Sequence, residues 1–153
     1  MRLFFDTNVI IDEINPRRDG HQVVLDLEQI LEGSYADTAQ LICAWHSLSI
    51  IEYIGAKTLG REYTHDALKE IFKRYDIPAT GKRDAERAFD YMSSDYEDAM
   101  QIASAVAGRA AYIVTNDKSG FSKSPIPVVT PGELLKVMSW GAGHVIHYER
   151  EFY

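Results

Sequence analysis

Two short apolar segments that each run into an aspartate constrain the fold more than any other feature of this sequence. Residues 3–5 are followed by Asp6-Thr7-Asn8, and residues 112–115 are followed by Asn116-Asp117. Short apolar segments bounded by turn residues are typical of buried strands. In open α/β sheets, ligands bind beyond the carboxyl ends of such strands. Asp6 and Asp117 are therefore the first candidates for a functional site.

Helices are predicted between the strands by apolar residues spaced three and four apart. The pattern is clearest at residues 85–92 and 99–106, and it also appears at residues 23–31 and 48–54. Residues 39–45 fit a strand or a helix, because their spacing does not decide between the two. Strands that alternate with helices predict a parallel sheet covered by helices on both faces.

The composition fits one globular domain. The chain has 153 residues, of which 46% are hydrophobic and 25% charged, and this length can bury a single core. Its longest apolar runs fall well short of the about 20 residues that a membrane helix needs. The single cysteine, Cys43, excludes an intramolecular disulfide and suits a cytoplasmic location. The formal net charge of −7 argues at first against a nucleic-acid partner, because such proteins usually present a basic face.

Several acidic residues stand at positions where carboxylates can converge. They are Asp6, Glu52, the segment 95–98 and Asp117. Taken singly, the aspartates have simple structural roles, as helix caps or turn residues. Glu52 is different, because its helix is apolar on nearly every face, and a buried carboxylate must be paired, protonated or bound to a cation.

The helix at residues 99–106 predicts which acids of the segment 95–98 face inward. At about 100° per residue, Glu97 points away from the apolar stripe, and we expect it to be solvated. Asp98 borders the stripe and Asp95 lies near it. Carboxylates that converge repel each other, and Mg²⁺ or Mn²⁺ with oxygen ligands relieves that repulsion. Such a site suggests phosphodiester hydrolysis.

Four segments in order resemble the PIN domain family, close to its VapC-type toxin ribonucleases. They are FFDTNVIID, SLSIIEY, DYEDAMQIASA and YIVTND, the last followed by a phenylalanine and SPIPVVTPGELL. The likeness covers residues 1–138, which we interpret as a PIN-like nuclease domain. Residues 139–153 form a C-terminal extension of uncertain structure, which fits an extra strand or a dimer contact. His144 and His147 in that extension have metal-like spacing but are better explained as a solvated tail.

The resemblance implies a three-layer α/β/α sandwich with a central, mostly parallel sheet and an acidic site that hydrolyses RNA with Mg²⁺ or Mn²⁺. Matched position by position, the catalytic and metal-binding acids are Asp6, Glu52, Asp98 and Asp117, with Asp95 as a supporting ligand. Gly120 is a departure, because many members carry an aspartate directly before the phenylalanine. Either Asp117 alone supplies the fourth acid or the site is weakened there, and we expect the former because Asp117 lies nearer the strand end.

Two further groups of residues are candidates near the site. Candidates for orienting the carboxylates are Thr7, Asn8, Thr115 and Asn116, for which capping and turn formation are equally good explanations. Candidates for holding RNA phosphates are Arg17, Arg18 and Lys118, which belong to predicted loops near the strand ends.

The resemblance also implies partners: a homodimer, and a small antitoxin protein that plugs the site. Two alternatives stay open, a PIN-like binding module that has lost activity and a PIN nuclease of RNA processing. The four proposed ligand acids account for −4 of the net charge of −7, which leaves −3. We therefore expect RNA to bind only when metal is present, since the metal-free site repels phosphate.

Overall fold

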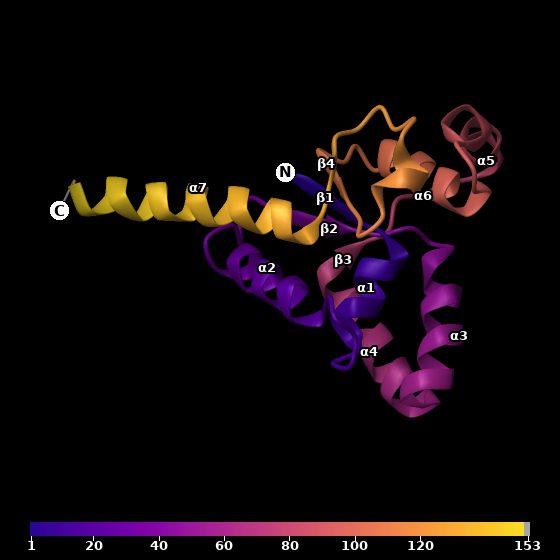
Figure 1. The fold of residues 1–153 in the computed structure, drawn as a ribbon, viewed down its shortest axis with the longest axis horizontal. Coiled ribbons are helices and arrows are strands. Elements are labelled where there is room, and N and C mark those ends of the chain that lie inside the picture. Colours follow the sequence, from indigo (N-terminus) through magenta and orange to yellow (C-terminus); the bar gives the residue numbers. More distant parts are fainter. Residues whose placement is uncertain (152–153) are drawn as a thin grey trace.

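The computed structural model describes the backbone of residues 1–151 and the side chains of residues 1–141. The side chains of His144 and His147 therefore lie outside the described part. Among the described residues, five strands form one parallel sheet in the order β3-β2-β1-β4-β5 (Figure 1). The strands are β1 (Arg2–Phe5), β2 (Gln40–Ile42), β3 (Tyr75–Asp76), β4 (Tyr112–Val114) and β5 (Val128–Val129).

The helices connect the strands as the alternating pattern predicts. They are α1 (Thr7–Ile14), α2 (His21–Gly33), α3 (Ser47–Leu59), α4 (Arg61–Arg74), α5 (Lys82–Arg87), α6 (Tyr96–Ala107) and α7 (Pro131–Glu151), with short 3₁₀ turns η1 (Ala88–Tyr91) and η2 (Lys118–Phe121). Residues 39–45 contain strand β2, which settles the ambiguous segment. The helix predicted at residues 85–92 is divided between α5 and η1.

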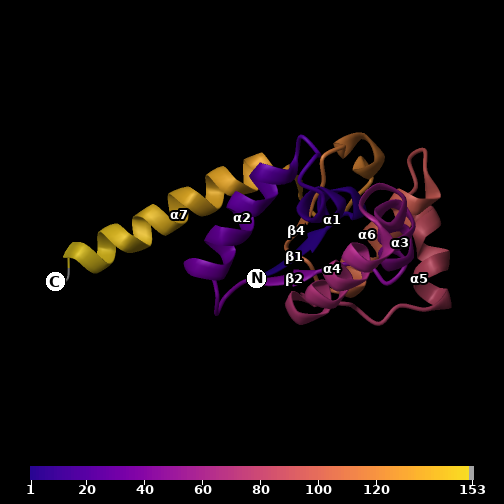
Figure 2. The ribbon, with the colours of Figure 1, turned by 90° about the horizontal axis from the view of Figure 1, so that it is seen from below.

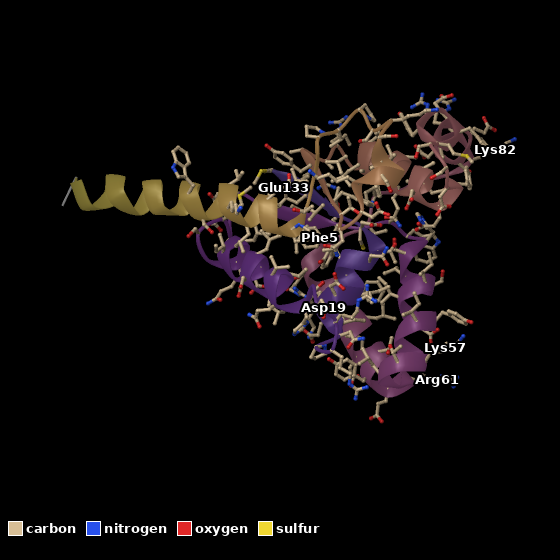
Figure 3. All side chains as sticks on the ribbon, viewed as in Figure 1. Phe5, Asp19, Lys57, Arg61, Lys82 and Glu133 are labelled. Carbon is tan, nitrogen blue, oxygen red and sulfur yellow. The ribbon has the colours of Figure 1, made fainter. Side chains whose placement is uncertain are left out.

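The sheet separates two layers of helices, so the three-layer α/β/α sandwich is confirmed. Alternate residues of β1 point to opposite faces, as the two-residue period of a strand requires. Leu3 and Phe5 pack in the cluster that α1, α2, α3, α4 and α7 cover, while Phe4 packs in the cluster under α6. Phe5 lies in the interior of the molecule in Figure 3.

Helix α7 begins at a capped end and leaves the body of the molecule. Thr130 Oγ1 accepts a hydrogen bond from the backbone N–H of Glu133 at 3.1 Å, and the first turns of α7 pack against α2. Beyond them the helix projects away from the sheet (Figures 1 and 2). Residues 139–151 are helical, so the extension does not add a strand there. No helix in the described part of the chain combines the length and apolar character needed to cross a membrane.

A buried ionic cluster, which the sequence did not indicate, joins three helices on the face that carries α2. Arg74 at the end of α4 pairs with Glu13 of α1, and its Nη1 lies 3.1 Å from Glu28 Oε1 of α2. Tyr75 donates its hydroxyl proton to Glu13 Oε2 at 2.9 Å. Burial, together with the neighbouring Glu13, raises the pKa of Glu28. The cluster therefore depends on one arginine to compensate two buried carboxyl groups.

Candidate active site

The site begins where β1 and β4 end side by side. Asp6 directly follows β1, and its backbone N–H donates to Val114 O of β4 at 3.0 Å. Thr115 follows β4, and its hydroxyl donates to Asp6 Oδ2 at 2.9 Å. Asp6 is only 3% exposed. Burial raises its pKa to about 7, with added repulsion from Glu97 and Asp98, although the Thr115 hydrogen bond acts in the opposite direction.

The first turn of α6 brings a second set of carboxylates to Asp6. Asp95 is the N-cap, and its Oδ1 accepts from the backbone N–H of Glu97 at 3.0 Å. Asp95, Glu97 and Asp98 each offer an oxygen within 4.8 Å of the others. Partial burial raises the pKa of Asp98 to about 6, and the negative charges of Glu97 and Asp95 add to the shift. Asp95 does cap the helix, as the structural explanation predicts, and it also belongs to the acidic cluster.

Glu97 is partly solvated, with a side chain that is 36% exposed, and it also has partners within the protein. Its Oε1 lies 2.6 Å from Gln101 Nε2 and 3.2 Å from His46 Nε2. Burial acts to raise the pKa of Glu97, but the hydrogen bonds from His46 and Gln101 outweigh it, and the pKa lies below its ordinary value. The helical period fixes the direction of the Cα–Cβ bond, whereas a long side chain turns toward the donors within its reach.

A buried polar layer supports this arrangement and was missed in the sequence. Gln101 is fully buried, and its Nε2 lies 2.9 Å from Ser47 Oγ and 2.5 Å from Thr7 Oγ1. The hydroxyls of Thr7 and Ser47 are 2.7 Å apart. The layer ties α1, α3 and α6 together beneath the acids. Its one sequence signal is Gln101, a polar side chain between the apolar residues Ala99 and Ile102.

Glu52 is partly exposed and is paired with a histidine. Its Oε1 is 3.1 Å from His65 Nε2 on α4, and its side chain is 39% exposed. Gly60, with a φ of 89°, ends α3 and begins α4. The two helices pack against each other, and this contact places Glu52 beside His65. The structure therefore gives Glu52 a partner other than the acidic cluster.

Asp117 borders the cluster from the loop after β4. It caps η2 by accepting from the backbone N–H of Ser119 at 3.0 Å, and the bonds from Ser119 lower its pKa. Asp117 is exposed, and its charge contributes to the raised pKa of Asp98. Gly120 lies against Asp98, because a Cβ at position 120 would collide with the Asp98 carboxylate. The Asp98 carboxylate thus occupies the space that a side chain at position 120 would need.

The residues predicted to orient carboxylates occupy several environments. Thr115 contacts Asp6, whereas Thr7 belongs to the polar layer. Asn8 is exposed. Asn116 donates to Asp12 Oδ2 at 2.5 Å. Asp12 is buried and was missed in the sequence, because it follows the apolar start of α1 as an ordinary helix residue.

Two of the three predicted RNA-binding cations line a hollow next to this loop. Arg17 and Arg18 line a cavity of about 460 Å³ together with Asp12 and Asn116. Arg18 Nε lies 2.5 Å from Asp12 Oδ1, so its charge is partly compensated. Lys118 is paired with Glu133, with an Nζ–Oε1 distance of 2.6 Å. Arg17 is exposed at the rim.

The donors at the cluster suit a hard divalent cation. Asp6, Asp95, Glu97 and Asp98 offer only carboxylate oxygens, the ligands that Mg²⁺ and Mn²⁺ prefer. Among residues 1–141, neither lysine nor arginine pairs with any of these four acids. Burial is the main cause of the raised pKa values of Asp6 and Asp98, and repulsion from the neighbouring carboxylates adds to both shifts. The arrangement can therefore hold a divalent cation at the carboxyl edge of the sheet.

The fold and the cluster together define an α/β/α domain with an acidic site at the carboxyl edge of a parallel sheet. The chain belongs to the PIN domain family, whose model matches residues 2–119. It is 28% identical over 140 residues to Ribonuclease VapC1 of Aquifex aeolicus (strain VF5), a match that covers 88% of this chain and 94% of the relative.

Solved structures share the fold. VapBC2 from Rickettsia felis, bound to a DNA fragment from its promoter, matches with a TM-score of 0.66 and 17% identity, over 85% of this chain and 98% of that one. The sarcin–ricin loop cleaving toxin VapC20 of Mycobacterium tuberculosis matches with a TM-score of 0.64 and 14% identity, over 81% and 95%. A toxin–antitoxin complex from Klebsiella pneumoniae matches with a TM-score of 0.61 and 25% identity, over 84% and 97%.

Proposed function

We propose that this protein is a metal-dependent endoribonuclease and the toxin of a type II toxin–antitoxin pair. The observation that carries the proposal is the convergence of Asp95, Glu97 and Asp98, without a compensating lysine or arginine among the described residues. Asp6 lies close enough for the charges of Glu97 and Asp98 to raise its pKa. The relative named Ribonuclease VapC1 supports RNA as the substrate. The nearby structures described as VapBC and toxin–antitoxin complexes support an antitoxin partner.

Each residue has a distinct role in the proposed site. Asp6, Glu97 and Asp98 hold Mg²⁺ or Mn²⁺, with Asp95 and Asp117 at the margin. The bound cation supplies Lewis-acid activation of water and neutralises charge that develops on the phosphate. Thr115 fixes the orientation of Asp6 by its hydrogen bond. Glu52 still matches the family's helix acid in sequence. Because Glu52 pairs with His65, we expect it to contribute less to metal binding than the other predicted acids.

RNA cleavage with matched variants tests the enzyme assignment. Purified protein is incubated with total RNA and Mg²⁺ or Mn²⁺, and the new ends are sequenced. We expect Asp6→Asn and Asp98→Asn to lose at least about 100-fold in rate, because each removes a charge from the cation site. Asp37→Asn is the control, since Asp37 is an exposed turn residue preceding β2, at the amino edge of the sheet. Wild-type rates in both site variants would contradict the proposal.

A catalytically weakened binding module is the alternative that Gly120 supports, because the aspartate found there in many members is missing. Thermal unfolding distinguishes the two functions. A working site should gain several degrees in Tm with Mn²⁺, since a ligand that binds only the folded state stabilises it. A chain that neither binds the metal nor cleaves RNA is the binding module.

The partner proposals have their own tests. A toxin should arrest growth when its expression is induced, and a short neighbouring reading frame should restore growth and copurify. A nuclease of RNA processing would cleave RNA without such a neighbour. We also propose a homodimer, which light scattering of the purified protein tests directly.

A further inference from the structure

An exposed tryptophan stands next to the acidic cluster without a role in it. Trp45 follows β2 at the carboxyl edge of the sheet and is 70% exposed. Single exposed apolar side chains are common on protein surfaces. Trp45, however, borders two adjoining hollows, one of about 150 Å³ and one of about 320 Å³. Its ring is therefore accessible at the edge of a shaped surface.

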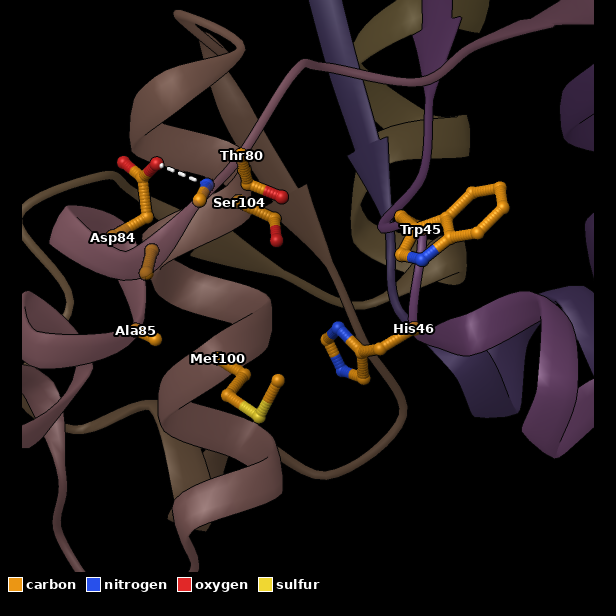
Figure 4. A pocket seen from close by; sticks show the side chains of 9 residues that line it. Trp45, His46, Thr80, Asp84, Ala85, Met100 and Ser104 are labelled. Atoms are coloured by element: carbon orange, nitrogen blue, oxygen red, sulfur yellow. Dashed lines mark hydrogen bonds between the residues drawn. The ribbon is translucent and has the colours of Figure 1, made fainter.

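The smaller hollow has the size and chemistry of a ring-binding pocket. A cavity of about 150 Å³ can hold one benzene-sized ring. Met100 and Ala85 provide apolar surface, and Thr80 and Ser104 provide hydroxyls. Figure 4 shows the His46 imidazole directed toward Met100, with the pocket open beside it. A flat heteroaromatic ring with polar edges matches this combination.

The pocket adjoins the candidate cation site. His46, which lines the pocket, is 3.2 Å from Glu97 Oε1 through its Nε2. Met100 lies three residues after Glu97 on the same helix, α6, and therefore on a neighbouring turn. A ring in this pocket and a phosphate at the acids can thus belong to neighbouring parts of one ligand.

Cations stand on the outer side of the same pocket. Gly81 and Asp84 line it, and between them lie Lys82 and Arg83, both exposed at the start of α5. Figure 3 shows Lys82 at the outer margin of the molecule. Single-stranded nucleic acid is recognised by aromatic side chains that stack on bases and by basic residues that follow the backbone.

We propose that Trp45, His46 and Met100 form a subsite for one unpaired base of the RNA, next to the phosphate at the acidic cluster. Lys82 and Arg83 contact the backbone on the far side of that base. The inference rests on the proposed ribonuclease function and adds to it a contact with one base of the substrate.

Fluorescence of Trp45 tests the subsite directly. The chain has two tryptophans, so Trp140→Phe leaves Trp45 as the single fluorophore. Stopped-flow mixing with 12-nucleotide oligo(U), oligo(A) or oligo(C) in Mg²⁺ records binding before cleavage. We expect quenching by these probes and none by an abasic 12-mer, which has the same backbone without bases.

Affinity measurements with labelled 12-mers complete the test. Trp45→Ala should weaken binding of the base-bearing probes by roughly 5- to 100-fold, the usual effect of losing one stacking side chain. Binding of the abasic probe should stay unchanged. Phe72→Ala is the matched control, because Phe72 is an exposed aromatic residue on α4 at 56% exposure. We expect that variant to bind like the wild type.

Three outcomes would overturn the subsite. In the first, Trp45→Ala binds the base-bearing probes as tightly as the wild type. In the second, the abasic probe quenches Trp45 fluorescence as strongly as the base-bearing probes. In the third, Trp45 fluorescence falls as the protein concentration rises, without any RNA present. The last outcome would assign Trp45 to a protein interface. If the protein cleaves RNA but Trp45→Ala does not change binding, the subsite is contradicted and the nuclease proposal stands. Base-dependent quenching without any cleavage supports the subsite and contradicts the nuclease proposal.

Discussion

The side-chain amide of Gln101 donates to Glu97 Oε1 at 2.6 Å and thereby decides where that carboxylate points. Gln101 is fully buried one turn further along α6. From the same position it reaches Ser47 Oγ at 2.9 Å. One glutamine thus couples the packing of two helices to the geometry of the acidic cluster, and its removal should affect both.

Gln101→Leu should lower stability and metal affinity together. The substitution leaves buried hydroxyls without their amide partner, which costs about 1–3 kcal/mol in the free energy of unfolding. Glu97 also loses a donor, so Mn²⁺ affinity should fall several-fold. Urea unfolding and calorimetric titration measure the two effects. Gln22→Leu is the control, because Gln22 bonds to Asp26 on the exposed side of α2. Equal effects of both variants would contradict the role of Gln101.

Metal affinity should separate Glu97 from Glu52. Glu97 lies within 4.8 Å of Asp95 and Asp98 through its nearest oxygen, whereas Glu52 pairs with His65. We therefore expect Glu97→Gln to reduce Mn²⁺ affinity at least about tenfold, because it removes one charged ligand. Glu52→Gln should change that affinity by less than about threefold. Calorimetric titration measures both, and the opposite order would return Glu52 to the cation site.

Asp6→Asn should stabilise the metal-free protein at alkaline pH. The pKa of Asp6 is raised by burial from 3.8 to about 7. The folded protein therefore binds the proton more tightly than the unfolded chain, and stability falls as pH rises through about 7. Asparagine does not ionise, so the variant should exceed wild type at pH 8 by on the order of 2–4 kcal/mol. The gap should narrow at pH 5.

Urea unfolding in EDTA at the two pH values measures this difference. Asp37→Asn serves as the control and should show no pH-dependent gap, because Asp37 is exposed. A gap between Asp6→Asn and wild type that is the same at pH 5 and pH 8 would show that burial does not raise the pKa of Asp6.

Arg74→Met should be among the most destabilising single substitutions. Glu13 and Glu28 have side chains only 4% and 8% exposed, and Arg74 is paired with both. Removing one partner of a buried ion pair costs about 3–5 kcal/mol, because a charge stays buried without compensation.

The neighbouring Lys73→Met provides the comparison. Lys73 pairs with Glu70 at 2.8 Å on the surface, and both side chains are well exposed. Its loss should cost less than about 1 kcal/mol. Adding Glu13→Gln to Arg74→Met should recover part of the stability in urea unfolding. Without such recovery, lost packing rather than the uncompensated charge explains the effect.

The local pattern of the sequence determined strands β1 and β4, most helices and the position of Asp6, but it left residues 39–45 open between a strand and a helix. A short apolar segment between helices is best explained as a buried strand of a parallel sheet. An aspartate directly after such a strand must lie at the carboxyl end of the strand. The alternation of strands and helices likewise left a parallel sheet as the simplest arrangement. These features depend on residues close together in the chain, and they were predicted correctly.

The tertiary structure alone decided which carboxylates meet. A helical period gives only the direction in which Glu97 and Glu52 leave their helices, and it does not give the groups that they contact. The partners that redirect them, Gln101 and His46 for Glu97 and His65 for Glu52, are supplied partly by other elements. A charged group settles where donors lie within reach, and only the packing of α3, α4 and α6 places those donors.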